Sequence, residues 1–241
     1  MPLCRLLEEH GASTLRFPTI EISALGDGQA TLRQVGALNA HDLIIFTSAN
    51  AVRFGAPLLG QRQDLTLAAI GPATARALNH AGYRVTVQPS AGFDSEQLLN
   101  HERLANLTGR RVVLIKGRDG RKLLEEELAR RGAAVLIADV YERVPVAAND
   151  SMLAGLLASF HSAAIQVITA TSLEIATRLL DMATPALRSE FERAHWLLPG
   201  ERVAAGVRAR GLSAPVLQAD SADDQDLLAA LVRWRSSASG A

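Results

Sequence analysis

The chain contains a single cysteine, Cys4, among its 241 residues. One thiol cannot form an internal disulfide, and such sparse cysteine use is typical of reducing compartments, so we expect a cytoplasmic protein. No apolar run approaches the roughly 18 residues that a membrane-spanning helix needs. The N-terminal stretch carries Glu8 and Glu9 where a signal peptide would have its apolar region. The sequence therefore predicts no membrane partner.

Motifs for metals and nucleotides are also missing. The six histidines lack the spacing of metal ligands, and no cluster of cysteine and histidine occurs. The chain has neither the GxxxxGK(S/T) of a Walker loop nor the GxGxxG of a dinucleotide-binding fold, and it has no GxSxG nucleophile turn. These patterns therefore give no support for a metal site or a nucleotide cofactor.

Charge of either sign is not in excess, because 25 basic residues balance 25 acidic ones. A net charge of zero provides no global field that would attract nucleic acid. Lysine is scarce, since Lys116 and Lys122 are the only two and the other basic side chains are arginine. Arginine suits bidentate contacts with carboxylates or phosphates, although a GC-rich genome would produce the same bias.

What the sequence does contain is an internal repeat. LIIFTSANAVR at 43–53 resembles IQVITATSLEIATR at 165–178. The matched positions are Thr47-Ser48 with Thr171-Ser172, Gly71 with Gly200, Gly82 with Gly211, and Leu98-Leu99 with Leu227-Leu228. A repeat of this length indicates two similar domains, and we expect function to lie in a cleft between them.

Short apolar segments alternate with amphipathic helical ones, which is typical of a parallel sheet covered by helices. The strands expected between 20 and 144 are Leu43–Phe46, Leu67–Ile70, Arg84–Val87, Val112–Ile115 and Val135–Val140. The helices expected there include Ala73–Ala81, Ser95–Leu107 and Arg121–Arg131, of which the first and last end at Gly82 and Gly132 as left-handed stops. In the second copy the expected strands are Ile165–Thr169, Trp196–Leu198 and Val216–Gln218.

The second copy is discontinuous. The N-terminal PLCRLLEEHGASTLRF resembles LLEEELARRGAAVLIA of the first copy, so residues 1–19 and 145–241 should form one outer domain. Residues 20–144 form the other domain, inserted into it. We predict an α/β fold of two similar doubly wound, flavodoxin-like parallel-sheet domains. The crossings at 18–23 and 141–148 should form a two-stranded linker that permits hinge motion.

The two copies differ in strand number. The inserted domain has five expected strands and the outer domain four, counting ASTLRF after Gly11. The counterpart of RRVVLIKGRDG is absent, so the first strand of the outer domain is expected to be missing upstream of Met1. A late start site or a truncated chain would explain this, and a four-stranded outer domain is the alternative.

Turns that lead from strands into helices are the candidate ligand sites, because open α/β sheets bind ligands at the carboxyl ends of their strands. Four such turns are Thr47–Asn50, Gly71–Thr74, Thr171–Glu174 and Pro199–Arg202. Each offers backbone N–H groups at the positive end of a helix, where a carboxylate or phosphate can bind. Helix capping by serine and threonine is the competing interpretation.

A fifth turn, Lys116–Arg121, is rich in glycine and basic side chains. It includes Gly120 and Arg121, and it suits either an anion or a solvated surface. Tyr141 ends a long apolar strand on the second crossing. Its phenol can donate a proton to a ligand, or its ring can simply pack at a domain junction.

The strings FTSANAV, AAIGPATARALNHAGYRV, LIKGRDGRKLLEEELARRGA and VYERVP, in this order and spacing, resemble the uroporphyrinogen-III synthase family over almost the whole chain. The resemblance implies a cofactor-free, monomeric lyase of tetrapyrrole biosynthesis that acts on the small molecule hydroxymethylbilane. In that family water leaves the hydroxymethyl carbon of ring A, ring D attacks the resulting azafulvene through its substituted carbon, and a spiro intermediate recloses with ring D inverted.

By the same resemblance, Tyr141 is the proton donor on the linker. Ser48, Thr74 and Ser172 match hydroxyl positions that orient substrate carboxylates, and Thr47, Thr171, Gly120 and Arg121 belong to the turns that surround them. Backbone N–H groups near Asn50 and Gly71 are expected to assist, since the substrate carries eight carboxylates.

Two departures from the family pattern limit the transfer of roles. The first strand and its threonine-arginine-proline turn are absent, and Glu201 occupies a turn where many relatives keep a hydroxyl. The alternatives are a non-catalytic two-domain binder of a polycarboxylate small molecule and an inactive, N-terminally truncated synthase.

Overall fold

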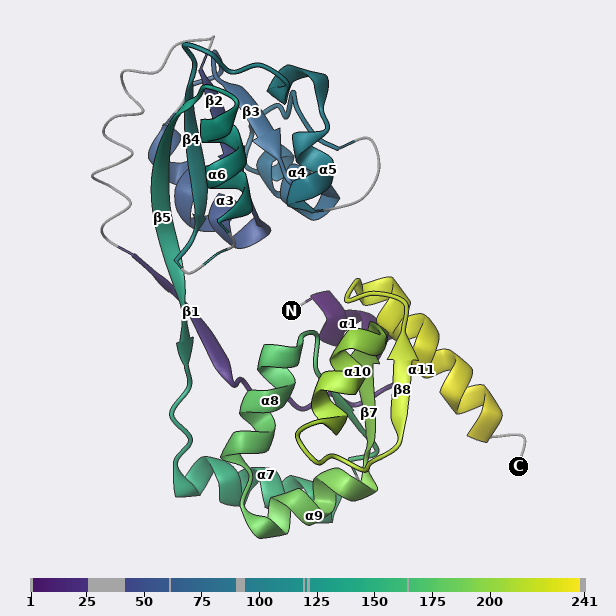
Figure 1. The fold of residues 1–241 in the computed structure, drawn as a ribbon. Helices are drawn as coiled ribbons and strands as arrows, with labels where there is room; N and C mark the ends of the chain where they lie inside the picture. The colour runs from purple at the N-terminus through teal and green to yellow at the C-terminus, as the bar shows by residue number, and fades with distance from the viewer. Residues whose placement is uncertain are drawn as a thin grey trace. The chain divides into compact units, whose positions relative to one another are not determined.

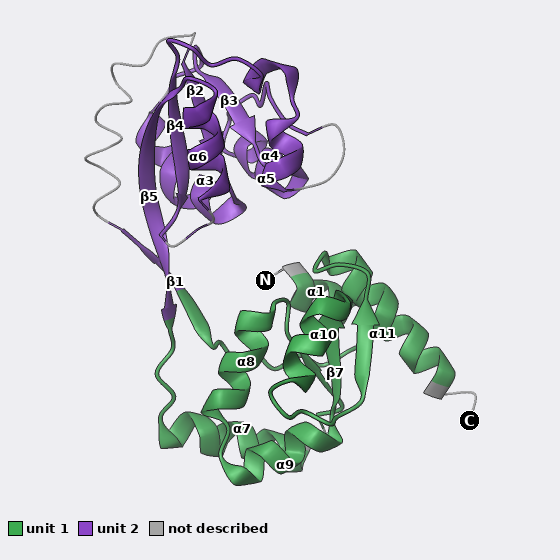
Figure 2. Cartoon of the chain, in the orientation of Figure 1, with its two compact units in different colours: residues 1–21, 145–241 green, residues 22–144 purple. Residues whose placement is uncertain are grey.

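The structure is a computed structural model that describes residues 2–25, 42–60, 62–89, 94–118, 120, 122–163 and 165–238. The chain divides into two compact units (Figure 2). Unit 1 comprises Met1–Glu21 and Pro145–Ala241, and unit 2 comprises Ile22–Val144. The sequence interpretation placed the crossings at 19/20 and 144/145, and the units change at 21/22 and 144/145.

Unit 2 is built around a sheet in the order β1-β5-β4-β2-β3 (Figure 1). Its strands are β1 (Ile20–Ala24), β2 (Leu43–Phe46), β3 (Thr66–Ala69), β4 (Arg111–Gly117) and β5 (Ala134–Pro145). The pairs β2–β3, β2–β4 and β4–β5 are all parallel. The first parallel strand, β2, therefore lies between β3 and β4, so the four parallel strands run in the order 2-1-3-4, as in flavodoxin-like sheets.

Helices cover both faces of this sheet, as a doubly wound fold requires. They are α3 (Ala49–Gly55), α4 (Pro72–His80), α5 (Ser95–Leu99) and α6 (Leu123–Arg130), with 3-10 turns η2 (Ala56–Leu59) and η3 (Glu102–Leu104). Buried residues of α3 and α4 pack with Ile44 and Val113 on one face. Those of α5 and α6 pack with Ile45 and Leu114 on the other. The doubly wound α/β prediction is confirmed.

Unit 1 has a three-stranded parallel sheet, β6 (Val167–Thr169), β7 (His195–Pro199) and β8 (Val216–Ala219), in the order β6-β7-β8. Its helices are α1 (Pro2–Glu9), α7 (Asp150–Ala163), α8 (Leu173–Met182), α9 (Pro185–Arg193), α10 (Gly200–Arg208) and α11 (Asp224–Ala238). Trp196 packs with α7 to α10 on one face of the sheet, whereas Leu197 packs with α1 and α11 on the other.

The two expected linker strands pair with each other. β1 and β5 are hydrogen-bonded neighbours, and Leu25 N–H donates to Val140 O while Val146 N–H donates to Thr19 O. These two bonds join opposite ends of the segments, so the pair is antiparallel. The prediction of a two-stranded linker is confirmed.

Two expected elements of unit 2 are shorter than predicted. The segment 84–87 forms only an isolated bridge between Val87 and Ala68, because the N–H groups of Thr86 and Val87 both donate to Leu67 O and interrupt the ladder. The helix expected over 95–107 ends at Leu99, since His101 has extended backbone and its Nδ1 accepts from Arg103 N–H to begin η3.

The fourth strand expected in unit 1 is wrong as well, because residues 12–18 are not in a strand. Their counterpart in unit 2, β5, hydrogen-bonds to β4, and no described strand of unit 1 takes the place of β4. An extended segment without a partner leaves its backbone groups to the solvent and forms no ladder. β6 is accordingly half-exposed, whereas its repeat counterpart β2 is fully buried.

Gly82 and Gly132 confirm the predicted helix stops, with φ of +85° and +90°. Their surroundings differ. A Cβ on Gly132 would lie 2.8 Å from Thr108 Oγ1 and 3.1 Å from Thr108 Cα, whereas a Cβ on Gly82 would meet nothing within 4 Å.

We expect Gly82→Ala to lower the free energy of unfolding by about 1–2 kcal/mol, the cost of the left-handed conformation. Gly132→Ala should cost clearly more, because the new methyl must also displace the backbone of Thr108. Urea unfolding of both variants measures the difference within one unit. Equal losses would show that the contact with Thr108 relaxes without cost.

Candidate functional site

The candidate site lies where β2 and β4 end side by side. The register pairs Phe46 with Ile115, so the segments after these residues leave the same edge of the sheet. The segment after β2 enters α3 on one face, and the segment after β4 leads to α6 on the other. This divergence is a topological switch point, the position where open α/β sheets bind ligands.

Ser48 and Tyr141 meet at this edge. Ser48 follows β2 and is the N-cap of α3, where its Oγ accepts a hydrogen bond from Ala51 N–H at 3.0 Å. The same Oγ lies 3.1 Å from the Tyr141 hydroxyl on β5, and either atom can be the donor. Residues 93 positions apart thus form one hydroxyl pair.

The pair always has one O–H left for an outside acceptor. Each hydroxyl supplies one proton, and their mutual bond uses one of the two. If Tyr141 donates to Ser48, the serine proton remains; if Ser48 donates, the phenol proton remains. Tyr141 is only 5% exposed whereas Ser48 is half-buried, so the serine side of the pair is the more accessible.

Packing holds the Tyr141 ring in place. The ring stacks on Phe54 of α3 with 6.0 Å between centroids. Its backbone carbonyl accepts from Arg118 N–H at 2.8 Å, and Arg118 forms an ion pair with the neighbouring Glu142. Sequence reasoning missed Phe54, although its position on the helix that Ser48 begins was the available signal.

The remaining predicted residues of the first turn have different surroundings. The Thr47 hydroxyl donates to Ile115 O at 3.4 Å, so it ties β2 to β4. Asn50 is half-buried in the first turn of α3.

Of the two helix starts described in unit 2 at α3 and α4, the one at α4 has fewer hydrogen bonds to its backbone N–H groups. Gly71 is its N-cap and makes no side-chain capping bond, and the first turn contains no acidic residue. Thr74 is buried within that turn. The backbone N–H groups at this helix start are therefore the better anion donors.

Unit 1 repeats the same contrast. Ser172 caps α8 by accepting from Ile175 N–H at 3.3 Å, and Thr171 precedes it in the half-buried turn. α10 begins without a side-chain cap, but its first turn carries Glu201, which pairs with Arg208 at 3.3 Å. The negative charge of Glu201 disfavours an anion at that helix start.

The basic turn after β4 is partly neutralised. Lys116 is buried, and its Nζ lies 3.3 Å from Asp139 Oδ1. That contact is an ion pair without hydrogen-bond geometry, because Asp139 Oδ1 has no hydrogen bond among the described residues. Gly120 closes the turn by donating its N–H to Gly117 O at 3.4 Å, and Arg121 lies outside the described residues.

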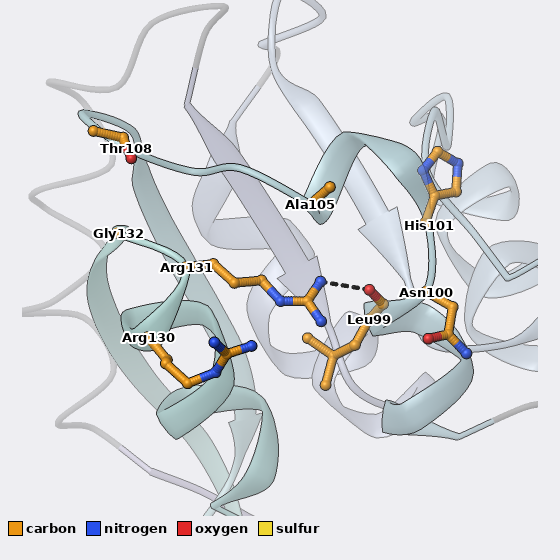
Figure 3. A pocket seen from close by; sticks show the side chains of 8 residues that line it. All are labelled: Leu99, Asn100, His101, Ala105, Thr108, Arg130, Arg131 and Gly132. Carbon is orange, nitrogen blue, oxygen red and sulfur yellow. Dashed lines mark hydrogen bonds between the residues drawn. The ribbon is translucent and has the colours of Figure 1, made fainter.

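A cavity of about 550 Å³ lies near the amino-terminal ends of β4 and β5, since Thr108 and Gly132 line it. Figure 3 shows its lining residues. Arg131 extends through the cavity and donates to Leu99 O and Leu104 O. Arg130 and the Nε of Arg131 both donate hydrogen bonds to the Glu127 carboxylate. These two arginines lower the pKa of that carboxyl to about 2. The guanidinium of Arg131 thus joins the end of α6 to the α5–η3 segment, and this structural role explains its place in the cavity.

Comparison with known proteins identifies relatives over nearly the whole chain. A family model described as uroporphyrinogen-III synthase HemD matches residues 2–229. The uroporphyrinogen-III synthase of Escherichia coli K12 is 29% identical over 235 residues, covering 92% of this chain and 91% of that protein. The one from Salmonella typhimurium is 31% identical over 229 residues, covering 89% and 88%.

Solved structures show the same fold. A mutant uroporphyrinogen III synthase from the extremely thermophilic bacterium Thermus thermophilus matches with a TM-score of 0.61 at 21% identity, covering 100% of this chain and 95% of that one. A uroporphyrinogen-III synthetase from Helicobacter pylori matches with a TM-score of 0.62 at 17% identity, covering 93% of each chain. At these identities the likeness establishes the fold alone.

Ser48 and Ser172 are repeat-related caps, yet only Ser48 also has a tyrosine partner among the described residues. We expect Ser172→Ala to cost about 1 kcal/mol, the usual loss for a removed N-cap. Ser48→Ala should cost about 2–4 kcal/mol, because it also leaves a buried phenol without its partner.

In a Tyr141→Phe background, the cost of Ser48→Ala should fall to that of a simple cap. Urea unfolding of the single and double variants measures this coupling. An unchanged cost in the phenylalanine background would mean that the two hydroxyls do not interact in solution.

Proposed function

The chain belongs to the uroporphyrinogen-III synthase family, a lyase family of tetrapyrrole biosynthesis, and on this premise we propose that it closes hydroxymethylbilane to uroporphyrinogen III. The reaction removes one water molecule and inverts ring D. The observation that carries the proposal to a specific site is the Ser48–Tyr141 hydroxyl pair at the switch point of unit 2.

Tyr141 acts as the proton donor. The hydroxyl group of the substrate leaves ring A as water once it receives a proton, and the electron pair of the ring nitrogen forms the azafulvene. The substituted carbon of ring D then bonds to the former hydroxymethyl carbon, and the spiro intermediate opens and recloses with ring D reversed. The ring D carbon that forms the final bond loses its hydrogen as a proton, which balances the proton given to the leaving hydroxyl. A single general acid of modest strength suffices for the first step. The pair can supply it, because one of its two O–H groups is not used in the hydrogen bond between Ser48 and Tyr141.

The proton can reach the substrate by two routes. Tyr141 can donate directly when Ser48 donates to it, or Ser48 can donate while it accepts from Tyr141. In the second route the phenol replaces the proton that the serine gives away, so one net proton leaves the pair. The greater exposure of Ser48 favours the second route.

Substrate carboxylates bind at the strand-to-helix turns. The proposed contacts are Thr47, Ser48, Asn50, Gly71, Thr74, Gly120, Arg121, Thr171 and Ser172. The strongest support concerns α4, whose first turn lacks both a side-chain cap and an acidic residue. Its N–H groups and helix dipole favour a carboxylate there. Binding spread over many turns implies that most single substitutions weaken turnover without abolishing it.

Incubation with freshly prepared hydroxymethylbilane tests the function directly. We expect the type III isomer, whereas spontaneous closure gives type I. Chromatographic separation of the oxidised products measures their ratio. Type I alone, at the rate of a protein-free control, would overturn the proposal and leave a non-catalytic polycarboxylate binder or an inactive fragment.

Tyr141→Phe tests the proton donor. We expect turnover to fall by about 100-fold or more, because a lost general acid typically costs two to four orders of magnitude. Steady-state kinetics with isomer analysis measures the change.

Tyr83→Phe is the matched control, since it removes the only other tyrosine hydroxyl of the chain. The Tyr83 hydroxyl donates to Ala56 O within unit 2, so its loss should lower stability and spare turnover. Unchanged turnover in Tyr141→Phe would remove Tyr141 from the mechanism.

A further inference from the structure

Gly117 is a glycine at the end of a strand, and its backbone conformation does not require glycine. It is the last residue of β4, and its φ lies outside the left-handed range that favours glycine. Glycine within a strand weakens that strand, because it adds backbone entropy and has no side chain to pack. A glycine at such a position therefore indicates that something approaches its backbone closely.

The group that approaches is the ring of Tyr141. A Cβ on Gly117 would lie 2.6 Å from Tyr141 Cζ, 2.7 Å from Cε2 and 3.0 Å from the hydroxyl oxygen. The hydroxyl end of the ring therefore rests directly on the Cα of Gly117. With Phe54 stacked against the ring, the phenol is confined from two directions.

The strand pairing places the ring over this glycine. β4 pairs with β5 residue by residue up to Lys116, which is opposite Asp139. Gly117 is then opposite Tyr141, so Val140 is an extra residue on β5. Such a bulge redirects the side chain that follows it. Lys116 and Asp139, the last opposed pair before the shift, also form an ion pair.

We propose that Gly117 is a positioning residue, which together with the bulge at Val140 aims the Tyr141 hydroxyl at Ser48. This inference rests on the proposed function of Tyr141 as proton donor. Any side chain at 117 must push the ring away by roughly 1 Å to reach ordinary van der Waals contact. Such a displacement changes the geometry of the hydroxyl bond to Ser48, which is 3.1 Å long in the structure and depends on both distance and angle.

The first experiment measures turnover of Gly117→Ala. We expect kcat to fall by about 100-fold with KM changed less than about threefold, because a displacement of 1 Å in a reacting group can cost two orders of magnitude. Gly155→Ala is the control, since a Cβ on Gly155 in α7 meets nothing within 4 Å. It should leave kcat and KM unchanged. Full turnover in Gly117→Ala would overturn the proposal.

A double variant separates positioning from general damage to β4. Leucine at 141 lacks the three atoms that the new methyl would meet, so Gly117→Ala should cost no further turnover in a Tyr141→Leu background. If Gly117→Ala alone fails to fold, the double variant should fold again. The same loss in both backgrounds, or a double variant that stays unfolded, would overturn the positioning role.

Tyrosine labelled with carbon-13 at Cζ provides a readout that does not need activity. The chain has two tyrosines, so Tyr141→Phe assigns both signals. We expect Gly117→Ala and Ser48→Ala to shift the Tyr141 signal and to leave that of Tyr83 in place. An unmoved Tyr141 signal would overturn the positioning role, whereas full turnover in Tyr141→Phe would instead show that the proposed proton donor is wrong.

Discussion

The parallel pairing of β2 with β4 is the constraint on which the candidate site depends. It places Thr47 beside Ile115, to which Thr47 donates through both its N–H and its hydroxyl. The chain leaves these two strands toward opposite faces of the sheet, so the edge between them is not covered by either connection. Because β5 pairs with β4, it delivers Tyr141 to the same edge, and Ser48 at the start of α3 is then within hydrogen-bonding distance.

Duplication supplied both units with the same turns, and their chemistry has since diverged. Ser48 and Ser172 both cap a helix, but of the two, as far as the described residues show, only Ser48 has a buried phenol as its second partner. The helix starts at Gly71 and Pro199 both lack a side-chain cap, but Glu201 removes much of the attraction for anions at the second. The capping interpretation and the ligand interpretation are therefore compatible at Ser48. Its one oxygen accepts the capping hydrogen bond of α3 and also bonds the Tyr141 hydroxyl.

Much of the fold could be predicted because its signals are local. The apolar segments of β2 and β4, the left-handed stop at Gly82 and the serine cap of α3 depend on neighbours within a few residues. The failures have equally specific causes. His101 interrupts an otherwise helical pattern by capping a new turn with its side chain, and the segment at 84–87 loses its ladder because two amides share one carbonyl.

The sequence by itself determined the α/β class, the duplication and the strand-to-helix turns, because hydrophobic periodicity, glycine stops and helix caps act between residues close in the chain. Only the tertiary structure decided which side chains meet. The pairing of Ser48 with Tyr141, the pairing of Lys116 with Asp139 and the contact of the ring with Gly117 all depend on strand order and on a one-residue shift in register. Such a shift moves side chains by several ångströms and leaves no periodic signal, so it is set by packing across the sheet.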